Sequence, residues 1–280
     1  MIRRLLSRFA NRRDADIAES EAPSFTHAST PDGVRLIAVG DIHGNLDLLL
    51  ELVAGLEAEC RNAPAPTHLI FLGDYIDRGP ASAQVVDWLA GFAPGWATPH
   101  FLRGNHEQCL IDILSGAAPD DTLAAWLDYG GRETLSSYGL GVPVLYSDDL
   151  QAIRDESRRA VPAHHLGFLH DTRSHLRFQD YLFVHAGVRP GVPMEAQNEE
   201  DLLWIREPFL SSDEDFGAVV VHGHTITPAP ESRRNRIAID TGVYRHGVLT
   251  AVILEGQSRR FIAAERSAAE VRQPAHQIGG

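Results

Sequence analysis

The chain has 280 residues, of which 44% are apolar and 22% charged, and its formal net charge is −13 at pH 7. This length and apolar content allow a full hydrophobic core. The negative charge argues against nucleic acid as a partner, because affinity for a polyanion comes chiefly from Lys and Arg. Two cysteines, Cys60 and Cys109, are too few for a disulfide framework. We therefore expect free thiols and a cytoplasmic protein.

The two ends of the chain show no clear element. Residues 1–30 begin with a basic, weakly amphipathic stretch that is too short to span a membrane. We expect a disordered tail there, with weak contact to an acidic surface as the alternative. Residues 266–280 contain Pro and Gly and are expected to be a loose tail. Between these ends we expect a single domain over residues 31–265.

Three units with the same pattern follow in chain order. Each has an apolar run that ends in glycine, then a polar turn, then a segment with helical periodicity. The apolar runs are VRLIAV (34–39), HLIFL (68–72) and HFLR (100–103), and the helical segments cover 46–59, 82–92 and 110–114. This order is typical of parallel βαβ units, in which ligands bind beyond the carboxyl ends of the strands.

The rest of the chain changes character twice. Residues 117–175 show helical patterns without a clear strand and predict an inserted helical cap. Short β-branched runs then follow, and they predict a second sheet. These runs cover residues 181–187, 218–225, 236–242, 247–256 and 259–265.

Five polar clusters come directly after apolar runs. They are GDIHGN (40–45), GDYIDRG (73–79), RGNHE (103–107), HAG (185–187) and HGHT (222–225). One such cluster alone is usually a turn. Together they supply oxygen and imidazole ligands, which suit Mn²⁺, Fe²⁺ or Zn²⁺. The sequence therefore predicts a divalent metal site at the edge of the sheet.

In this order, these motifs resemble those of the phosphoprotein phosphatase family of binuclear, calcineurin-like metallophosphoesterases, and especially its bacterial and phage branch. The resemblance covers about residues 34–256. It implies an α/β fold, a four-layer α/β/β/α sandwich of two mixed β-sheets. It also implies two divalent metal ions, with Mn²⁺ favoured over Fe and Zn. The implied metal ligands are Asp41, His43, Asp74, Asn105, His185 and His224, with Asp74 bridging both ions.

The resemblance further implies a hydroxide that bridges the two metals as the nucleophile. His106 would be the general acid that protonates the leaving group, and Asp77 its partner. Arg78 and Arg206 would hold phosphate oxygens. Arg103 is a candidate for the same role, with a supporting contact behind the ligands as an equal alternative.

Several other residues receive plainer interpretations. In HGHT, His224 is the expected ligand and His222 a core residue. Asp240 is interpreted as a turn residue or a hydrogen-bond acceptor near the site. Packing roles are expected for three tryptophans, Trp88, Trp96 and Trp126.

The function that this pattern favours is a metal-dependent phosphomonoesterase, specifically a serine/threonine protein phosphatase, with a phosphorylated protein or small phosphoester as substrate. The alternative is a diadenosine tetraphosphate hydrolase. Relatives of that kind tend to lack an aspartate at the position of Asp77 and to have Gly-Asn-His-Asp in the third motif, whereas this chain has Glu107. A non-catalytic module that binds phosphoproteins is a remote alternative, because no ligand or general acid is missing.

Overall fold

The computed structural model describes residues 28–267. A first five-stranded sheet has the order β10-β9-β1-β2-β3. Its strands are β1 (Arg35–Val39), β2 (Thr67–Phe71), β3 (Thr98–Phe101), β9 (Val248–Glu255) and β10 (Ser258–Glu265). The pairs β1–β2 and β2–β3 are parallel, as the three repeated units predict, and β9 is antiparallel to both β1 and β10.

The second sheet is also mixed and five-stranded, with the order β4-β5-β6-β8-β7. Its strands are β4 (His175–Phe178), β5 (Tyr181–Val184), β6 (Val219–His222), β7 (Glu231–Ser232) and β8 (Arg236–Ala238). Strands β5, β6 and β8 are parallel, so their carboxyl ends lie at one edge of the sheet. The short edge strands β4 and β7 were not predicted from the sequence.

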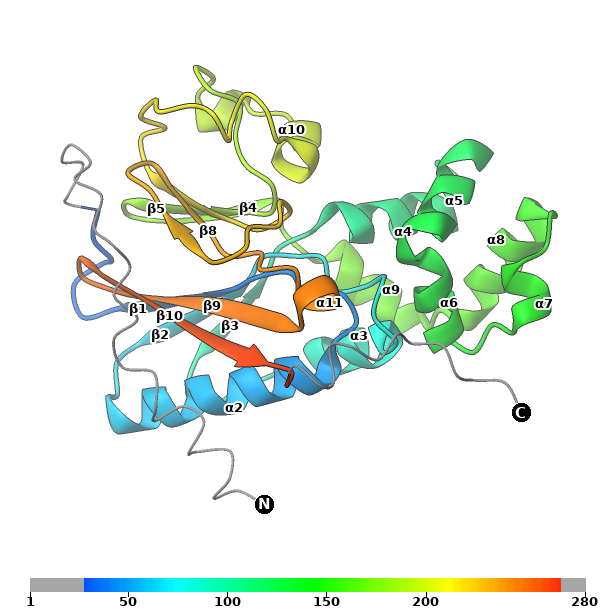
Figure 1. Ribbon diagram of the computed structural model, residues 1–280, viewed down its shortest axis with the longest axis horizontal. Helices are drawn as coiled ribbons and strands as arrows, with labels where there is room; N and C mark the ends of the chain where they lie inside the picture. The colour runs from blue at the N-terminus through cyan, green and yellow to red at the C-terminus, as the bar shows by residue number, and fades with distance from the viewer. Residues whose placement is uncertain (1–27, 268–280) are drawn as a thin grey trace.

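Alternation of side chains along the strands explains the layers. In β1, Leu36 and Ala38 face the second sheet, while Ile37 and Val39 face the helices on the other side. Helices α2 (Leu46–Asn62) and α3 (Ser82–Ala90) cover that outer face, and α10 (Glu199–Trp204) covers the outer face of the second sheet (Figure 1). The predicted four-layer α/β/β/α sandwich is thereby confirmed.

The predicted helical insertion is also present. Figure 1 shows the helices that follow β3 gathered at one end of the sandwich. They are α4 (Asn105–Ser115), α5 (Asp120–Trp126), the π-helical turn η1 (Leu127–Gly131), α6 (Arg132–Ser137), α7 (Val142–Leu145), α8 (Leu150–Ala160) and α9 (Ala163–His170). The buried Arg154 of α8 donates to the carbonyls of Ile113 and Ala118, which ties the insertion to the end of α4. A short η2 (Met194–Ala196) and α11 (Val243–His246) complete the helices of the described range.

The ordered fold extends slightly beyond the predicted boundaries. Thr30, expected in the tail, is buried and exchanges hydrogen bonds with Gly256. Arg266, expected in the other tail, pairs with Asp47 on α2. Most of the predicted tails, residues 1–27 and 268–280, lies outside the described residues. Within residues 28–267, no helix is both long and apolar enough to cross a membrane.

Candidate metal centre

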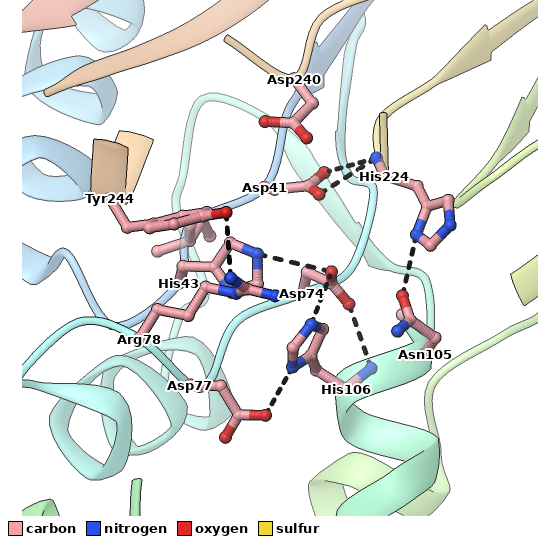
Figure 2. A network of polar contacts seen from close by, with 12 residues as sticks. Asp41, His43, Asp74, Asp77, Arg78, Asn105, His106, His224, Asp240 and Tyr244 are labelled. Atoms are coloured by element: carbon pink, nitrogen blue, oxygen red, sulfur yellow. Dashed lines mark hydrogen bonds and ion pairs between the residues drawn. The ribbon is translucent and has the colours of Figure 1, made fainter. Parts of the chain in front are cut away.

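The six predicted metal ligands come together at the carboxyl ends of the strands. Asp41 and His43 follow β1, Asp74 follows β2, and His185 and His224 follow β5 and β6. The sixth, Asn105, lies in the first turn of α4. All six are buried, and Figure 2 shows most of them converging on one point between the strand ends and this helix. Parallel strands thus bring together residues that are far apart in the sequence.

The backbone around this point is strained. Five non-glycine residues of the motifs have positive φ: His43 (43°), Asp74 (51°), Asp77 (72°), Arg78 (69°) and His224 (63°). Such conformations cost about 1–3 kcal/mol each and persist only where the surrounding structure enforces them. These turns direct the side chains of His43, Asp74 and His224 toward the site, while Asp77 reaches His106 and Arg78 reaches Tyr244.

Glu107 holds two of the motif loops together. Its carboxylate accepts hydrogen bonds from the backbone amides of Asp74 (2.7 Å), Tyr75 (2.8 Å), Ile76 (3.3 Å) and Gly104 (2.9 Å). Its bond to Gly104 is the reciprocal part of a capping box, so α4 starts at Asn105 rather than at the predicted residue 110. This role of Glu107 was not predicted, although a carboxylate three residues after a possible N-cap is a known signal.

One part of the centre consists of Asp74, His185 and His224. Asn105 joins it, because its Oδ1 lies 2.9 Å from His185 Nε2 and 3.0 Å from His224 Nδ1. His185 Nδ1 lies 3.0 Å from the carbonyl oxygen of Leu72, which can only accept, so Nδ1 carries the proton and Nε2 presents a lone pair. The lone pair of His185 Nε2 and the Asn105 oxygen then face each other. Two acceptors repel each other at this distance, and a cation bound by both would remove the repulsion.

The distances also fit a metal. Two ligands that are each about 2.1 Å from a metal and about 90–110° apart lie about 3.0–3.4 Å from each other. Asp74 Oδ1 is 3.4 Å from His185 Nε2. Burial lowers the pKa of both His185 and His224, and neutral imidazole is the form that binds a metal. Asn105 adds a ligand oxygen without adding negative charge.

The other part of the centre consists of His43, Asp74 and His106. His43 Nε2 lies 3.5 Å from Asp74 Oδ2, while its Nδ1 contacts the carbonyl of Ile76 at 2.8 Å. Burial lowers the pKa of His43 to about 3, so this imidazole is also a neutral ligand. The two oxygens of Asp74 therefore face different histidines, Oδ2 toward His43 and Oδ1 toward His185, as a bridging carboxylate would.

Asp41 lies outside both triads. Its carboxylate accepts from the backbone amide of His224 at 3.0 and 3.3 Å, and Asp240 lies beside it (Figure 2). Burial, Asp240 and Asp74 raise the pKa of Asp41 well above its ordinary value, and burial raises that of Asp240 to about 6. A cation beside these acids would relieve their repulsion. The assignment of Asp41 as a metal ligand stays a prediction. For Asp240, the structure agrees with one of the two interpretations, a hydrogen-bond acceptor near the site.

His106 and Asp77 form the predicted pair. His106 Nδ1 lies 2.5 Å from Asp77 Oδ2, and its Nε2 lies on the side of Asp74, 3.8 Å from Oδ2. Burial alone would lower the pKa of His106, but Asp74 and the bond to Asp77 raise it to about 9. The cap supplies two further donors to Asp77, Trp126 Nε1 at 2.7 Å and Thr134 Oγ1 at 2.5 Å. Trp126 is thus more than the packing residue that the sequence predicted.

The sequence profile of the calcineurin-like phosphoesterases matches residues 34–247 of this chain. The chain belongs to the calcineurin-like phosphoesterases. The two buried triads are consistent with the binuclear, metal-dependent hydrolases of this family. The predicted superfamily and the prediction of an enzyme are thereby confirmed.

Comparison with individual proteins gives partial matches. A symmetrical bis(5'-nucleosyl)-tetraphosphatase of Yersinia pestis is 32% identical over 114 residues, which is 40% of this chain and 37% of that protein. The chain thus spans well under half the length of this curated relative. A solved structure of a protein proposed to be a diadenosine tetraphosphatase has a TM-score of 0.59 at 19% identity, covering 87% of this chain and all of that one. A mutant cold-active protein tyrosine phosphatase gives 0.50 at 17% identity, covering 90% and 88%. At these identities the structural matches show the fold alone.

The predicted phosphate-binding arginines differ in their surroundings. In this phosphoesterase, Arg78 Nη1 donates to Tyr244 Oη at 3.0 Å, and its guanidinium lies 4.5 Å from the Tyr244 ring centre (Figure 2). Tyr244 also packs edge-on against His43, a contact that the sequence did not predict. Arg206 is exposed, and its positive charge lowers the pKa of His185 and His224. Binding of phosphate by these two arginines stays a prediction.

Most of the guanidinium of Arg103 is engaged by the protein. Its Nε and Nη1 each donate one hydrogen bond, to the Thr172 hydroxyl and to Gln108, and its Nη2 donates to the carbonyls of His170 and Thr172. A bidentate contact with phosphate would require breaking at least one of these bonds. The structure therefore favours the supporting role that was the alternative for this residue, and its assignment to phosphate stays a prediction.

His222 and His224 lie apart even though only one residue separates them. Strand β6 ends at His222, and His224 has positive φ, so strand alternation no longer applies between them. His222 is fully buried and packs edge-on against Phe209. Its position agrees with the expected core role.

Proposed function

We propose that this calcineurin-like phosphoesterase hydrolyses its substrate at a centre for two divalent metal ions that share Asp74. The observation that carries the proposal is the placement of the Asp74 carboxylate, whose two oxygens face separate sets of buried ligands. Bound metals would polarise a phosphoryl group and lower the pKa of a coordinated water to about 7. The mixed oxygen and nitrogen ligands favour Mn²⁺, Fe²⁺ or Zn²⁺, and Mn²⁺ is the first to test.

The residues of the chain would divide the remaining tasks. His43, Asp74, Asn105, His185 and His224 would hold the metals, and Asp41 would complete the set. Arg78 and Arg206 would orient the phosphate by charge-assisted hydrogen bonds. His106, held by Asp77, would donate a proton to the leaving oxygen.

Dinucleoside tetraphosphates are the substrate class that the comparisons support best. Several curated relatives that match this chain bear the name of symmetrical bis(5'-nucleosyl)-tetraphosphatases. This support reverses the order that the motifs suggested, in which phosphoproteins came first. It rests on a match to 37% of the relative, and we propose this substrate class as the first candidate on that basis.

Phosphoserine and phosphothreonine proteins are the second candidate, as in the phosphoprotein phosphatase branch of the family. The observation that favours them is the His106–Asp77 pair. A serine or threonine alkoxide is a poor leaving group and needs a proton donor, whereas a nucleoside diphosphate leaves readily as an anion. A preorganised proton donor is therefore more useful for an alkyl phosphoester than for a phosphoanhydride.

The deciding experiment is a side-by-side turnover measurement of the Mn²⁺-loaded protein. Diadenosine tetraphosphate cleaved symmetrically should give two ADP molecules, and phosphoserine, phosphothreonine and phosphotyrosine peptides should release phosphate. A kcat/KM that is at least tenfold higher for diadenosine tetraphosphate supports the first candidate, and the reverse ratio supports the second. Absence of turnover on all four substrates by protein containing two metals per chain would contradict the proposed function.

A further inference from the structure

A third group of metal-type ligands lies on the surface, away from the centre described above. It consists of Asp87 on α3 and of His164 and His165 in the first turn of α9. The candidate ligand atoms of these three residues lie within 4.8 Å of one another. The group therefore connects a helix that covers the first sheet to the last helix of the cap.

The geometry of this surface group is close to that of a metal site. Asp87 Oδ1 lies 3.3 Å from His165 Nε2 and 3.5 Å from His164 Nε2, and the two imidazole rings are 4.4 Å apart. Ligands about 2.1 Å from one metal are expected about 3.0–3.4 Å apart. Asp87 and His164 have side chains that are 70% and 64% exposed, which leaves an open face where water could complete the coordination.

His165 is held as a metal-binding histidine usually is. Its side chain is only 5% exposed, and its Nδ1 contacts the Tyr138 hydroxyl at 2.9 Å while its Nε2 points at Asp87. A metal-bound imidazole typically donates its other N–H to an oxygen in this way, which fixes the ring orientation. When Nδ1 donates to Tyr138, the lone pair of Nε2 faces the Asp87 carboxylate, and a cation between them turns repulsion into attraction.

We propose that Asp87, His164 and His165 bind one divalent transition-metal ion in addition to the two of the catalytic centre. Two imidazoles and one carboxylate suit Zn²⁺, Ni²⁺, Co²⁺ or Cu²⁺, and they do not suit Mg²⁺ or Ca²⁺, which prefer all-oxygen sites.

An ion at this site would cross-link α3 to the cap. Helix α3 packs against both α9 and α6, and α6 carries Thr134, which hydrogen-bonds to Asp77. A ligand that binds only the folded chain stabilises it in proportion to its occupancy. The ion would therefore hold the cap in the position in which it contacts the His106–Asp77 pair.

The test compares Zn²⁺ binding by the wild-type chain with that of His164→Ala and Asp87→Asn, all with Mn²⁺ present. Both positions are exposed, so the variants should fold. The wild type should bind one more equivalent of Zn²⁺ than either variant in calorimetric titration and elemental analysis. With Zn²⁺ at about 100 times the Kd of this site, the Tm of the wild type should rise by about 5–10 °C more than that of either variant.

Two further variants sharpen the test. His170→Ala removes another exposed histidine of the same helix, and it should bind as many ions as the wild type. Tyr138→Phe removes only the hydroxyl that orients His165, and it should weaken Zn²⁺ binding about 10- to 100-fold. Equal Zn²⁺ stoichiometry and equal Tm shifts in the wild type, His164→Ala and Asp87→Asn would overturn the proposal and leave the group as a hydrogen-bonded cluster. This result would not affect the catalytic proposal, because the catalytic ligands are unchanged.

Discussion

Replacing Asp77 with Asn would remove the carboxylate that holds His106 while keeping every predicted metal ligand. Asp77 Oδ2 lies 2.5 Å from His106 Nδ1, and a carboxylate at this distance favours the imidazolium, which can protonate a departing alkoxide. A hydrogen bond to a charged group is worth about 1.5–3 kcal/mol. We therefore expect kcat on an alkyl phosphate to fall about 10- to 150-fold.

The assay is a comparison of leaving groups. The loss in Asp77→Asn should be large on an alkyl phosphate and small on p-nitrophenyl phosphate, whose leaving group is stable as an anion. His106→Asn should show the same pattern with a larger loss, about 10²- to 10⁴-fold on the alkyl phosphate. Trp126→Phe is the matched control, because it removes another donor to the same Asp77 oxygen and keeps His106 in place.

The pH dependence of kcat gives an independent measurement. A general acid is lost as the pH rises through its pKa, and Asp77 is one of the groups that raise the pKa of His106 to about 9. Without Asp77 this pKa falls, so the alkaline decline of kcat should move to lower pH. Equal losses on both leaving groups, with unchanged metal content and an unchanged alkaline limb, would refute the assignment of His106 and Asp77.

The remaining predictions concern the ligands, the loop anchor and the arginines. Asp74→Asn should lose both bound metals and at least about 10³-fold of kcat, and elemental analysis that still finds two metals would show that Asp74 is not the bridge. Glu107→Gln should lower the free energy of unfolding by about 2–5 kcal/mol in urea titrations, because an amide nitrogen would then face two buried backbone N–H groups. A change below about 1 kcal/mol would contradict the role of Glu107 as an anchor of the two loops. Arg206→Ala should raise KM about tenfold or more without changing Tm. Arg103→Gln should lower Tm and leave KM within about twofold, since most of the Arg103 donors are bound by the protein. A raised KM with an unchanged Tm would instead assign Arg103 to phosphate binding.

The sequence was most informative about the side chains that come directly after the strands. Parallel neighbours have their carboxyl ends at one edge of a sheet, so Asp41 and Asp74 after β1 and β2 could be expected to meet, and so could His185 and His224 after β5 and β6. The face-to-face packing of the two sheets followed from the resemblance, whereas the apolar runs predicted only the individual strands. The edge strands β4 (HLRF) and β7 (ES) lack the continuous apolar run by which the other strands were recognised.

The contacts between the helical cap and the motif loops could not be predicted from the sequence. Trp126 and Thr134 reach Asp77 only because the insertion folds over the loop at 73–79, and no local periodicity encodes that return. Tyr244 of α11 lies 166 residues after Arg78 in the sequence, and no local pattern predicts their contact either. Arg103 is a case in which the sequence suggested a role too readily. A positive charge next to a predicted ligand made phosphate binding plausible, but the hydrogen bonds of Arg103 to Thr172 and His170 could not be read from the sequence.

The most direct test of the shared Asp74 is a crystal structure of the Mn²⁺-soaked protein with anomalous scattering recorded for the metal. Two peaks should lie on either side of the Asp74 carboxylate, each about 2.0–2.3 Å from one of its oxygens. One peak should also contact His43, and the other Asn105, His185 and His224. A single peak, or two peaks with Asp74 bound to neither, would contradict a centre in which this carboxylate joins two metals.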